Sequence, residues 1–259
     1  MKIRLQKAIA DAGLASRREA ERWISEGRVK VNGKVVTKPG TCVNPLSDEI
    51  RARGRVISRR QERVFLLLNK PANFLTSMGE DIRGRNTVMD LIKVSARVFP
   101  VGRLDFNTQG ALLLTSDGAL AKKLLDPKYK VPRVYLVKVR GIPDEKTLRR
   151  LSRGIRLENQ PTAPLEVNIN RISGKNSFLE IKMLEGKNRH VKRICEAVRH
   201  EVIRLKRTHF GNLNLTGLPI GAYRFLSPRE IKSLELLVIK EPVEKNNVRK
   251  HSLARPKRV

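Results

Sequence analysis

The chain has 259 residues, and its 55 lysines and arginines against 25 acidic residues give a net charge of +30 at pH 7. No apolar run reaches the eighteen or so residues of a membrane span, and the charged N-terminus lacks the apolar centre of a secretory signal. So large a positive excess favours a polyanionic partner, and nucleic acid is the leading candidate.

The first fifty residues predict a small basic module of two helices and a hairpin. Apolar residues at helical spacing indicate a first helix over residues 5–12. Ser16 and Glu19 have the spacing of a capping box, which predicts the start of a second helix. The dipeptide Asn32-Gly33 lies between two β-branched runs and is a strong signal for a two-residue hairpin turn.

This module resembles the small RNA-binding domain named after ribosomal protein S-four. The resemblance covers residues 1–48 and rests on the order helix, loop, capped helix and basic hairpin. It implies that basic side chains of the two helices, among them Arg17 and Arg18, bind RNA; the alternative is a solvated helix face. The six arginines of residues 50–63 indicate a last strand followed by a basic linker, so the module with its linker is placed at residues 1–60.

The second domain is expected at residues 61–240, and strands and helices are mixed along it. Expected strands are "VFLLLNKP" (64–71), the start of "ALLLTSDGALAKKLLD" (111–126), "RVYLVKV" (133–139) and "FLEIKML" (178–184). Expected helices are the end of that second segment, "NRHVKRICEAV" (188–198) and "SPREIKSLELLVI" (227–239). Regular βαβ spacing is absent, which predicts an α+β domain with a mixed, mainly antiparallel sheet flanked by helices. The basic tail 241–259 is expected to be disordered.

Cofactor motifs are missing from the sequence. Its two cysteines and four histidines have no metal-ligand spacing, and no Gly-x-Gly turn, P-loop or His-Glu-x-x-His occurs. We therefore expect no metal and no cofactor in a reduced, cytoplasmic protein. A catalytic pair of Cys195 and His190 is a minor alternative, because a spacing of five does not place both on one helical face.

Three motifs in order carry a second resemblance. They are "NKP" (69–71), "GRLDFNTQGALLLTSDG" (102–118) and "EGKNRHVKRI" (185–194). Alone, a Gly-Arg-x-Asp tetrapeptide is typical of a surface turn. As an ordered set after an S-four-type module, the motifs resemble the RsuA/RluB/RluE/RluF branch of the RNA pseudouridine synthases. The resemblance spans residues 1–238 and implies an enzyme that detaches uracil from its ribose, rotates it and rejoins it through carbon.

The resemblance also implies the site residues. Asp105 is the catalytic carboxylate, Tyr135 packs on the target base, and either Lys192 or Arg193 is the cation beside Asp105. Arg103 holds the phosphates of the flipped nucleotide, and Leu205 is an apolar wall of the pocket. Relatives commonly have glutamine at the position of His190 and arginine at that of Lys192. From the residues alone, Tyr135 and Leu205 could equally be core and Lys192 a solvated helix position.

Two further functions are open to the sequence. A non-catalytic rRNA-binding assembly factor could use the same charge and module, whereas an RNA methyltransferase is disfavoured by the absent glycine turn. The expected partner is ribosomal RNA or a precursor ribosomal particle, bound by a monomer. The basic tail and "GRNTVMDLI" (84–92) favour large-subunit rRNA. Whether Asp105 acts on the base or the sugar stays open.

Overall fold

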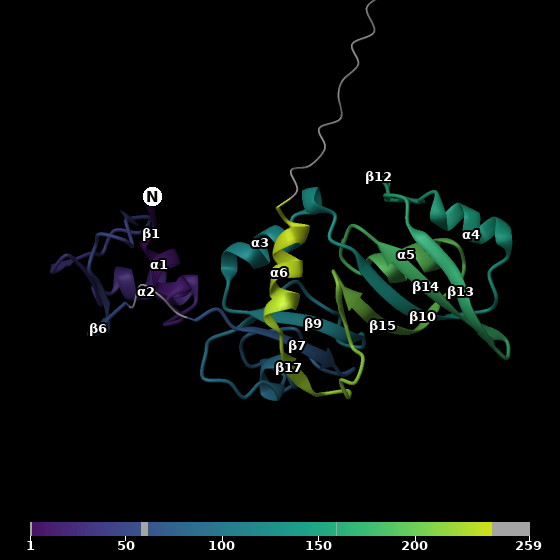
Figure 1. Ribbon diagram of the computed structural model, residues 1–259, viewed down its shortest axis with the longest axis horizontal. Helices are drawn as coiled ribbons and strands as arrows, with labels where there is room; N and C mark the ends of the chain where they lie inside the picture. Colours follow the sequence, from purple (N-terminus) through teal and green to yellow (C-terminus); the bar gives the residue numbers. More distant parts are fainter. Residues whose placement is uncertain (1, 58–61, 159, 240–259) are drawn as a thin grey trace, which may run out of the picture.

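The computed structural model describes residues 2–57, 62–158 and 160–239 (Figure 1). The expected linker residues 58–61 and the tail from 241 lie outside the described residues. Residues 2–57 form a small unit with its own apolar core, and a larger body begins at residue 62. None of the helices in the described ranges is long and apolar enough to cross a membrane.

The N-terminal unit contains the two expected helices, α1 (Leu5–Asp11) and α2 (Arg17–Ser25). Its strands are β1 (Ile3–Arg4), β2 (Val29–Val31), β3 (Lys34–Val35), β4 (Cys42–Val43), β5 (Ile50–Ala52) and β6 (Arg55–Val56). β1 pairs with β4, and the other four form a sheet in the order β3-β2-β5-β6. The φ angles of Asn32 (49°) and Gly33 (78°) are both positive, as a type I′ turn requires.

Two local expectations for this unit are only half right. Ser16 caps α2 by accepting from the backbone N–H of Glu19 at 3.1 Å, but the Glu19 carboxylate does not complete the box. It instead accepts from the indole of Trp23 at 2.8 Å and from Arg22 at 2.6 Å. Residues 50–56 form a hairpin of two strands rather than one, because Arg53 and Gly54 both adopt positive φ and turn the chain.

The larger body is built on one nine-stranded mixed sheet, which confirms the α+β fold. The main path runs β13-β14-β10-β15-β9-β7-β17, with β16 beside β15 and β8 beside β9. The bounds are β7 (Phe65–Lys70), β8 (Phe99–Pro100), β9 (Gln109–Thr115), β10 (Arg133–Arg140), β13 (Glu166–Ser173), β14 (Asn176–Met183), β15 (Val202–Phe210), β16 (Leu213–Asn214) and β17 (Tyr223–Phe225). Every pairing is antiparallel except that of β15 with β9, which joins the two halves of the sheet.

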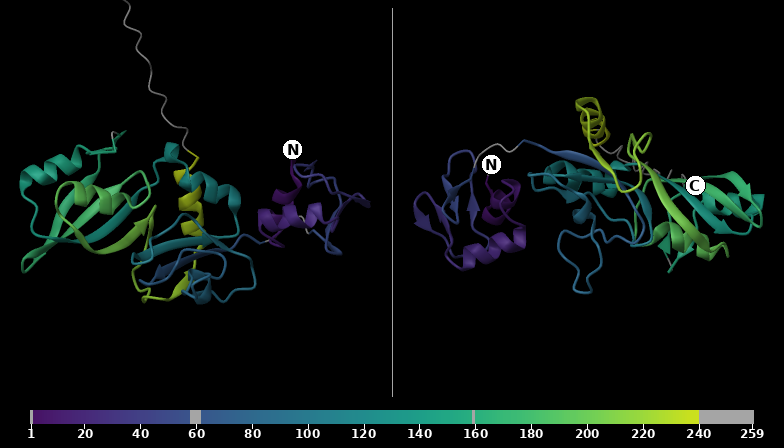
Figure 2. Two further views of the ribbon diagram at one scale, coloured as in Figure 1. Left: turned by 180° about the vertical axis from the view of Figure 1, so that it is seen from behind. Right: turned by 90° about the horizontal axis from the view of Figure 1, so that it is seen from below.

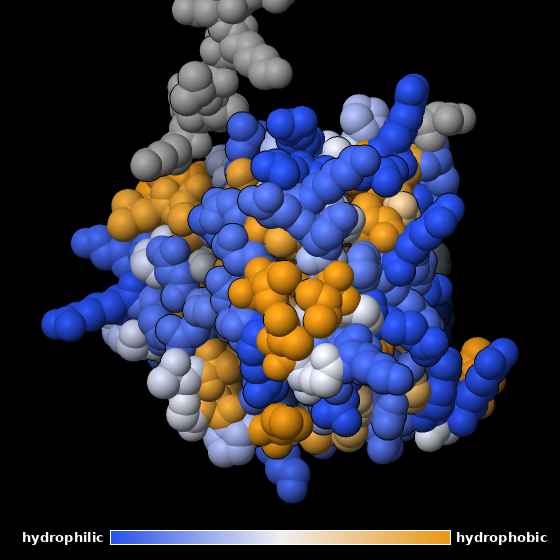
Figure 3. Space-filling model, turned by 90° about the vertical axis from the view of Figure 1, so that its right-hand side faces the viewer, coloured by the Kyte–Doolittle hydropathy of each residue, from blue (hydrophilic) through white to orange (hydrophobic). Residues whose placement is uncertain are grey.

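Helices cover the two halves of the sheet separately (Figures 1 and 2). α3 (Gly118–Leu125) and α6 (Pro228–Leu237) pack on the half that contains β7 and β9, whereas α4 (Glu145–Ser152) and α5 (His190–Ala197) pack on the other. Short elements complete the body: η1 (Val88–Leu91), η2 (Pro127–Tyr129), β11 (Arg156–Leu157) and β12 (Gln160–Pro161). The end that carries α4 and β13 is mostly hydrophilic, with hydrophobic patches between the charged side chains (Figure 3).

β7 is apolar on both faces because both are covered. Leu67 packs into the cluster under α3 and α6. Leu66 and Leu68 point to the opposite side, into a cluster that includes Val88 and Leu104. The continuous apolar run in the sequence therefore reflects a strand with no solvent face. Leu104 comes immediately before Asp105, so this second cluster anchors the loop that carries the candidate catalytic carboxylate.

Gly110 lies where the two halves of the sheet meet. Its φ is +114°, and a Cβ built there would lie 2.1 Å from the carbonyl oxygen of Arg207. No side chain can be accommodated at that distance, so the parallel contact between β9 and β15 requires glycine.

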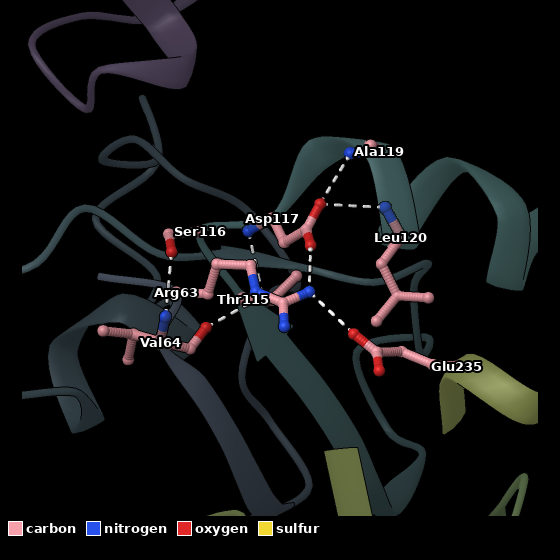
Figure 4. A network of polar contacts seen from close by, with 8 residues as sticks. All are labelled: Arg63, Val64, Thr115, Ser116, Asp117, Ala119, Leu120 and Glu235. Carbon is pink, nitrogen blue, oxygen red and sulfur yellow. Dashed lines mark hydrogen bonds and ion pairs between the residues drawn. The ribbon is translucent and has the colours of Figure 1, made fainter. Parts of the chain in front are cut away.

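A polar network ties the start of the body to two helices (Figure 4). The Arg63 guanidinium lies 3.2 Å from Asp117, the N-cap of α3, and 2.7 Å from Glu235 on α6. Nearby, the backbone N–H of Val64 donates to Ser116, and the Thr115 hydroxyl donates to the Val64 carbonyl. The network joins the first residues of the body, the end of β9, the start of α3 and the last turn of α6 into one corner of the fold.

Glu230 offers a test of the start of α6. Ser227 and Glu230 form a complete capping box, and Arg224 donates two hydrogen bonds to the Glu230 carboxylate at 2.7 and 2.8 Å. The bonds from Arg224 lower the pKa of Glu230 to about 2. We expect Glu230→Gln to reduce the free energy of unfolding at pH 7 by about 1 kcal/mol, measured by urea denaturation.

The difference should depend on pH in one direction. Because the folded pKa of Glu230 is depressed, its contribution is complete above about pH 4.3, the ordinary value in an unfolded chain. It is lost as the pH falls towards 2, so the gap between wild type and variant should narrow in acid. Lys232→Gln, an exposed change in the same helix, is the control and should leave stability unchanged. If the difference in the free energy of unfolding between wild type and Glu230→Gln is constant down to pH 3, the lowered pKa of Glu230 is not its cause.

Candidate active site

Asp105 lies in the loop that connects β8 to β9. Hydrogen bonds to its backbone hold this loop. The Thr76 hydroxyl donates to the Leu104 carbonyl at 2.8 Å, and the Thr108 N–H donates to the Asp105 carbonyl at 3.0 Å. The Asp105 side chain is 34% exposed and takes no part in these contacts. The loop can therefore keep its shape while the carboxylate remains free to meet a substrate.

A buried lysine supports the same loop from beneath. Lys70, the last residue of β7, has no exposed surface, and its ammonium lies within 2.9–3.2 Å of four carbonyl oxygens. Three of these oxygens belong to Asp105, Phe106 and Thr108. Burial lowers the pKa of Lys70 to about 8, and the negative charge of Asp105 opposes part of this shift. Lys70 is thus protonated at neutral pH and fixes the backbone around Asp105.

Sequence reasoning assigns no role to Lys70 beyond its place in the "NKP" motif. A lysine at the end of a continuous apolar strand is nevertheless a usable signal. Such a position buries the ammonium, and a buried ammonium requires acceptors for its three donors.

Lys192 is the cation beside the candidate catalytic carboxylate. Its Nζ lies 3.4 Å from Oδ2 of Asp105, and the Lys192 side chain is 20% exposed. The neighbouring Arg193 turns away and pairs with Glu158 at 2.7 Å. Between the two alternatives left by the sequence, the structure places Lys192 at Asp105.

Tyr135 and Leu205 lie on adjacent strands, β10 and β15. Both side chains are buried in the core cluster under α5, and both line a small cavity of about 60 Å³ together with Asp105. The two interpretations of these residues are therefore compatible: each packs in the core and also presents part of its surface to the site.

A larger pocket of about 630 Å³ opens next to this cavity. Its charged lining consists of Asp81, Arg85, Arg103, Asp105, Arg189 and Lys192, so cations outnumber carboxylates by four to two. Arg103 is exposed here, where it can reach a ligand. Arg85 stacks over Phe106 at 5.7 Å and binds Asp81 through two hydrogen bonds of 2.9 Å, which lower the pKa of Asp81 to about 2. The rim is positively charged, as phosphate binding requires.

Arg17 and Arg18 are not part of this pocket. Both are exposed at the start of α2 in the N-terminal unit, and neither lines the two cavities around Asp105. A contact of these arginines with RNA would therefore be made by a separate surface.

The Cys195–His190 alternative is not supported. Cys195 is completely buried in α5, and burial raises the pKa of its thiol to about 12, so almost no thiolate is available. Within residues 2–57, 62–158 and 160–239, no group of three or more His, Cys, Asp or Glu side chains is arranged to hold a metal ion.

The fold and the site together define an RNA-modifying enzyme: a carboxylate paired with a lysine beside an aromatic wall, a basic rim, and a separate basic module. Comparison with known families makes this specific. Residues 64–197 match the RNA pseudouridylate synthase family, and residues 3–50 match the S4 domain. The chain belongs to the RNA pseudouridine synthase family, and the resemblance seen in the motifs is confirmed.

Individual relatives agree along most of the chain. Ribosomal large subunit pseudouridine synthase B of Bacillus subtilis is 48% identical over 237 residues, which cover 90% of this chain and 96% of the relative. The protein of the same name from Yersinia pestis is 40% identical, and the match covers 95% of this chain and 81% of the relative. A crystal structure of a pseudouridylate synthase superposes with a TM-score of 0.65 at 28% identity, covering 90% of this chain and 99% of that one.

Proposed function

We propose that this enzyme converts one uridine of large-subunit ribosomal RNA to pseudouridine. The observation that carries the proposal is the Asp105–Lys192 pair, 3.4 Å apart, at a cavity walled by Tyr135 and Leu205. The substrate assignment rests on the relatives whose names specify the large ribosomal subunit. The protein acts as a monomer in the cytoplasm, on the rRNA or on a precursor particle.

The reaction needs no net change in composition. The bond between C1′ and N1 of the uridine breaks, and a bond between C1′ and C5 forms. C5 loses its proton and N1 gains one, so the composition is unchanged. Asp105 supplies the carboxylate that acts as nucleophile or base, and Lys192 stabilises its charge. No energy source enters this balance.

Reaching the uridine requires that it leave its stack, which costs a few kcal/mol. Stacking on Tyr135 returns on the order of 1–3 kcal/mol of that cost. Leu205 closes the apolar side of the cavity. Arg103, exposed on the basic rim, holds the phosphates of the flipped nucleotide.

The division of the chain follows from this assignment. Residues 1–60 supply RNA affinity, residues 61–240 carry the chemistry, and the basic tail 241–259 adds sequence-independent attraction. The support for the first part is the match of residues 3–50 to the S4 domain and the exposed arginines of α2.

Substituting Arg17 and Arg18 together with alanine should weaken RNA binding without slowing the chemical step. For every phosphate that the protein no longer neutralises, the slope of log K against log salt should fall by about 0.7–0.9. Fluorescence anisotropy across a KCl series measures the slope, and turnover at saturating RNA measures the chemistry. Arg149→Ala with Arg150→Ala, an exposed pair on α4, is the matched control. If the α2 pair leaves the slope unchanged, these arginines do not bind phosphate.

The function itself is tested by comparing ribosomal RNA from cells with and without the protein, site by site, with pseudouridine-specific chemistry. We expect one pseudouridine to disappear from large-subunit rRNA, and the purified protein to restore it. Loss of a small-subunit site would refute the proposed substrate. No loss at all, combined with delayed subunit assembly, would favour the non-catalytic assembly factor.

A further inference from the structure

Two buried polar side chains at the small cavity have no hydrogen-bond partner. The hydroxyl of Thr108 and both ring nitrogens of His190 are shielded from solvent, and none makes a hydrogen bond within the part of the chain that the structure describes. Thr108 is 2% exposed and His190 5% exposed, and both line the cavity that contains Asp105, Tyr135 and Leu205. A buried polar group left unpaired destabilises the fold, so two at one cavity require an explanation.

Neither side chain makes a hydrogen bond elsewhere among the described residues. Thr108 closes the Asp105 turn with its backbone, which donates to the Asp105 carbonyl and accepts from Lys70. His190 begins α5, and the nearest carboxylate, that of Glu185, lies 3.4 Å from Nε2 while accepting from the backbone of Ala163. Burial lowers the pKa of His190, so its ring is neutral and has one donor and one acceptor.

The cavity is the inner end of the larger pocket. The two share Arg103, Leu104, Asp105 and Arg189, and the inner one adds eight residues, among them Thr108, Tyr135, Lys187, Leu205 and His190. A ligand that enters past Asp105 therefore meets an aromatic ring, an aliphatic wall and two unpaired polar groups. A planar ring with apolar faces and a polar edge matches this lining, which is the general pattern of a flipped nucleobase.

We propose that Thr108 and His190 bind the polar edge of the target uracil, where one N–H lies between two carbonyl oxygens. A hydroxyl and a neutral imidazole can each donate to a carbonyl or accept from the N–H, so the edge supplies the partners that both side chains lack. The inference rests on the proposed function and extends it by naming the residues that recognise the base.

The test compares kcat/KM for a model RNA with uridine, 2-thiouridine or 4-thiouridine at the target position. Thr108→Val and His190→Leu remove the polar groups, whereas Thr108→Ser and His190→Gln keep a donor and an acceptor. With uridine we expect the first two to lose roughly 10- to 100-fold and the conservative pair to stay within about threefold of wild type.

The analogues separate recognition from damage. Sulfur is a weaker acceptor than oxygen, so wild type should discriminate against the analogue whose sulfur replaces a bound oxygen. Discrimination is the ratio of kcat/KM for uridine to kcat/KM for the analogue. In Thr108→Val or His190→Leu this ratio should be at least about threefold smaller than in wild type, because the variant cannot make the hydrogen bond that senses the sulfur. Variants that slow uridine and both analogues equally would overturn the proposal, since a structural role predicts that result.

The proposed function fails in a different way. If wild type forms no pseudouridine from any of these RNAs, the proposed function is wrong. If wild type is active but the variants have the same uridine-to-analogue ratios of kcat/KM as wild type, only the assignment of Thr108 and His190 to base recognition is refuted. Should His190→Leu not fold, Thr108→Val carries the test, since valine has nearly the shape of threonine.

Discussion

Replacing Asp105 with asparagine should abolish pseudouridine formation while RNA still binds. Asparagine keeps the shape but has no ionised oxygen to act as nucleophile or base, so turnover should fall by at least roughly 10⁴-fold. The fold should be unaffected, because Lys70 and Thr76 hold the loop through its backbone and not through the Asp105 carboxylate. RNA affinity should hold or rise, since the variant removes a negative charge close to phosphates.

Asp126→Asn is the matched control for this experiment. Asp126 is 35% exposed, against 34% for Asp105, and it too has a lysine within 4 Å. Asparagine also serves as an N-cap, so the short η2 helix should survive the change. Release of tritium from RNA labelled at C5 of uridine measures the activity of both proteins, and filter binding measures their RNA affinity. If Asp105→Asn keeps more than roughly 10⁻⁴ of the wild-type rate, the entire site assignment is refuted.

The second large effect is expected at Lys192. Lys192→Met keeps the length of the side chain but removes the positive charge that lies 3.4 Å from the Asp105 carboxylate. Without this cation the charged form of Asp105 is less favoured inside the pocket, so kcat should fall roughly 10- to 100-fold. Lys192→Arg should recover most of the activity, since it restores the charge.

Arg193→Met is the comparison that identifies the partner. Arg193 is the next residue after Lys192 and is also a cation, but its side chain points away from Asp105 and pairs with Glu158 at 2.7 Å. Its loss should leave kcat within about threefold of wild type. If Arg193→Met is severely impaired and Lys192→Met is unaffected, the ion pair is wrongly assigned, while Asp105 keeps its role.

Elements encoded by a few adjacent residues could be predicted from the sequence. The Asn32-Gly33 turn and the starts of α2 at Ser16 and of α6 at Ser227 depend on contacts within three residues. The motif order also identified the family, because the residue types at those spacings are specific. These features need no knowledge of where distant segments lie.

Predictions failed where a local signal had competing partners. Glu19 was free to complete a capping box, yet Trp23 and Arg22, one turn further along α2, provide stronger donors to its carboxylate. β15 was not predicted as a strand, although Leu205 was assigned within it. Its stability comes from β10 on one side and β9 on the other, and both lie far from it in the chain.

The sequence by itself determined which residue types the site contains: a carboxylate, a tyrosine, an apolar wall and two adjacent cations. Only the tertiary structure decided which cation meets Asp105. Successive helical residues point about 100° apart, so burial of Val191, Ile194 and Cys195 against the sheet directs Lys192 to the loop and Arg193 away. Only the tertiary structure also explains why position 110 must be glycine. The Arg207 backbone, 97 positions further along the chain, leaves no room there for a side chain, and no local sequence pattern contains that contact.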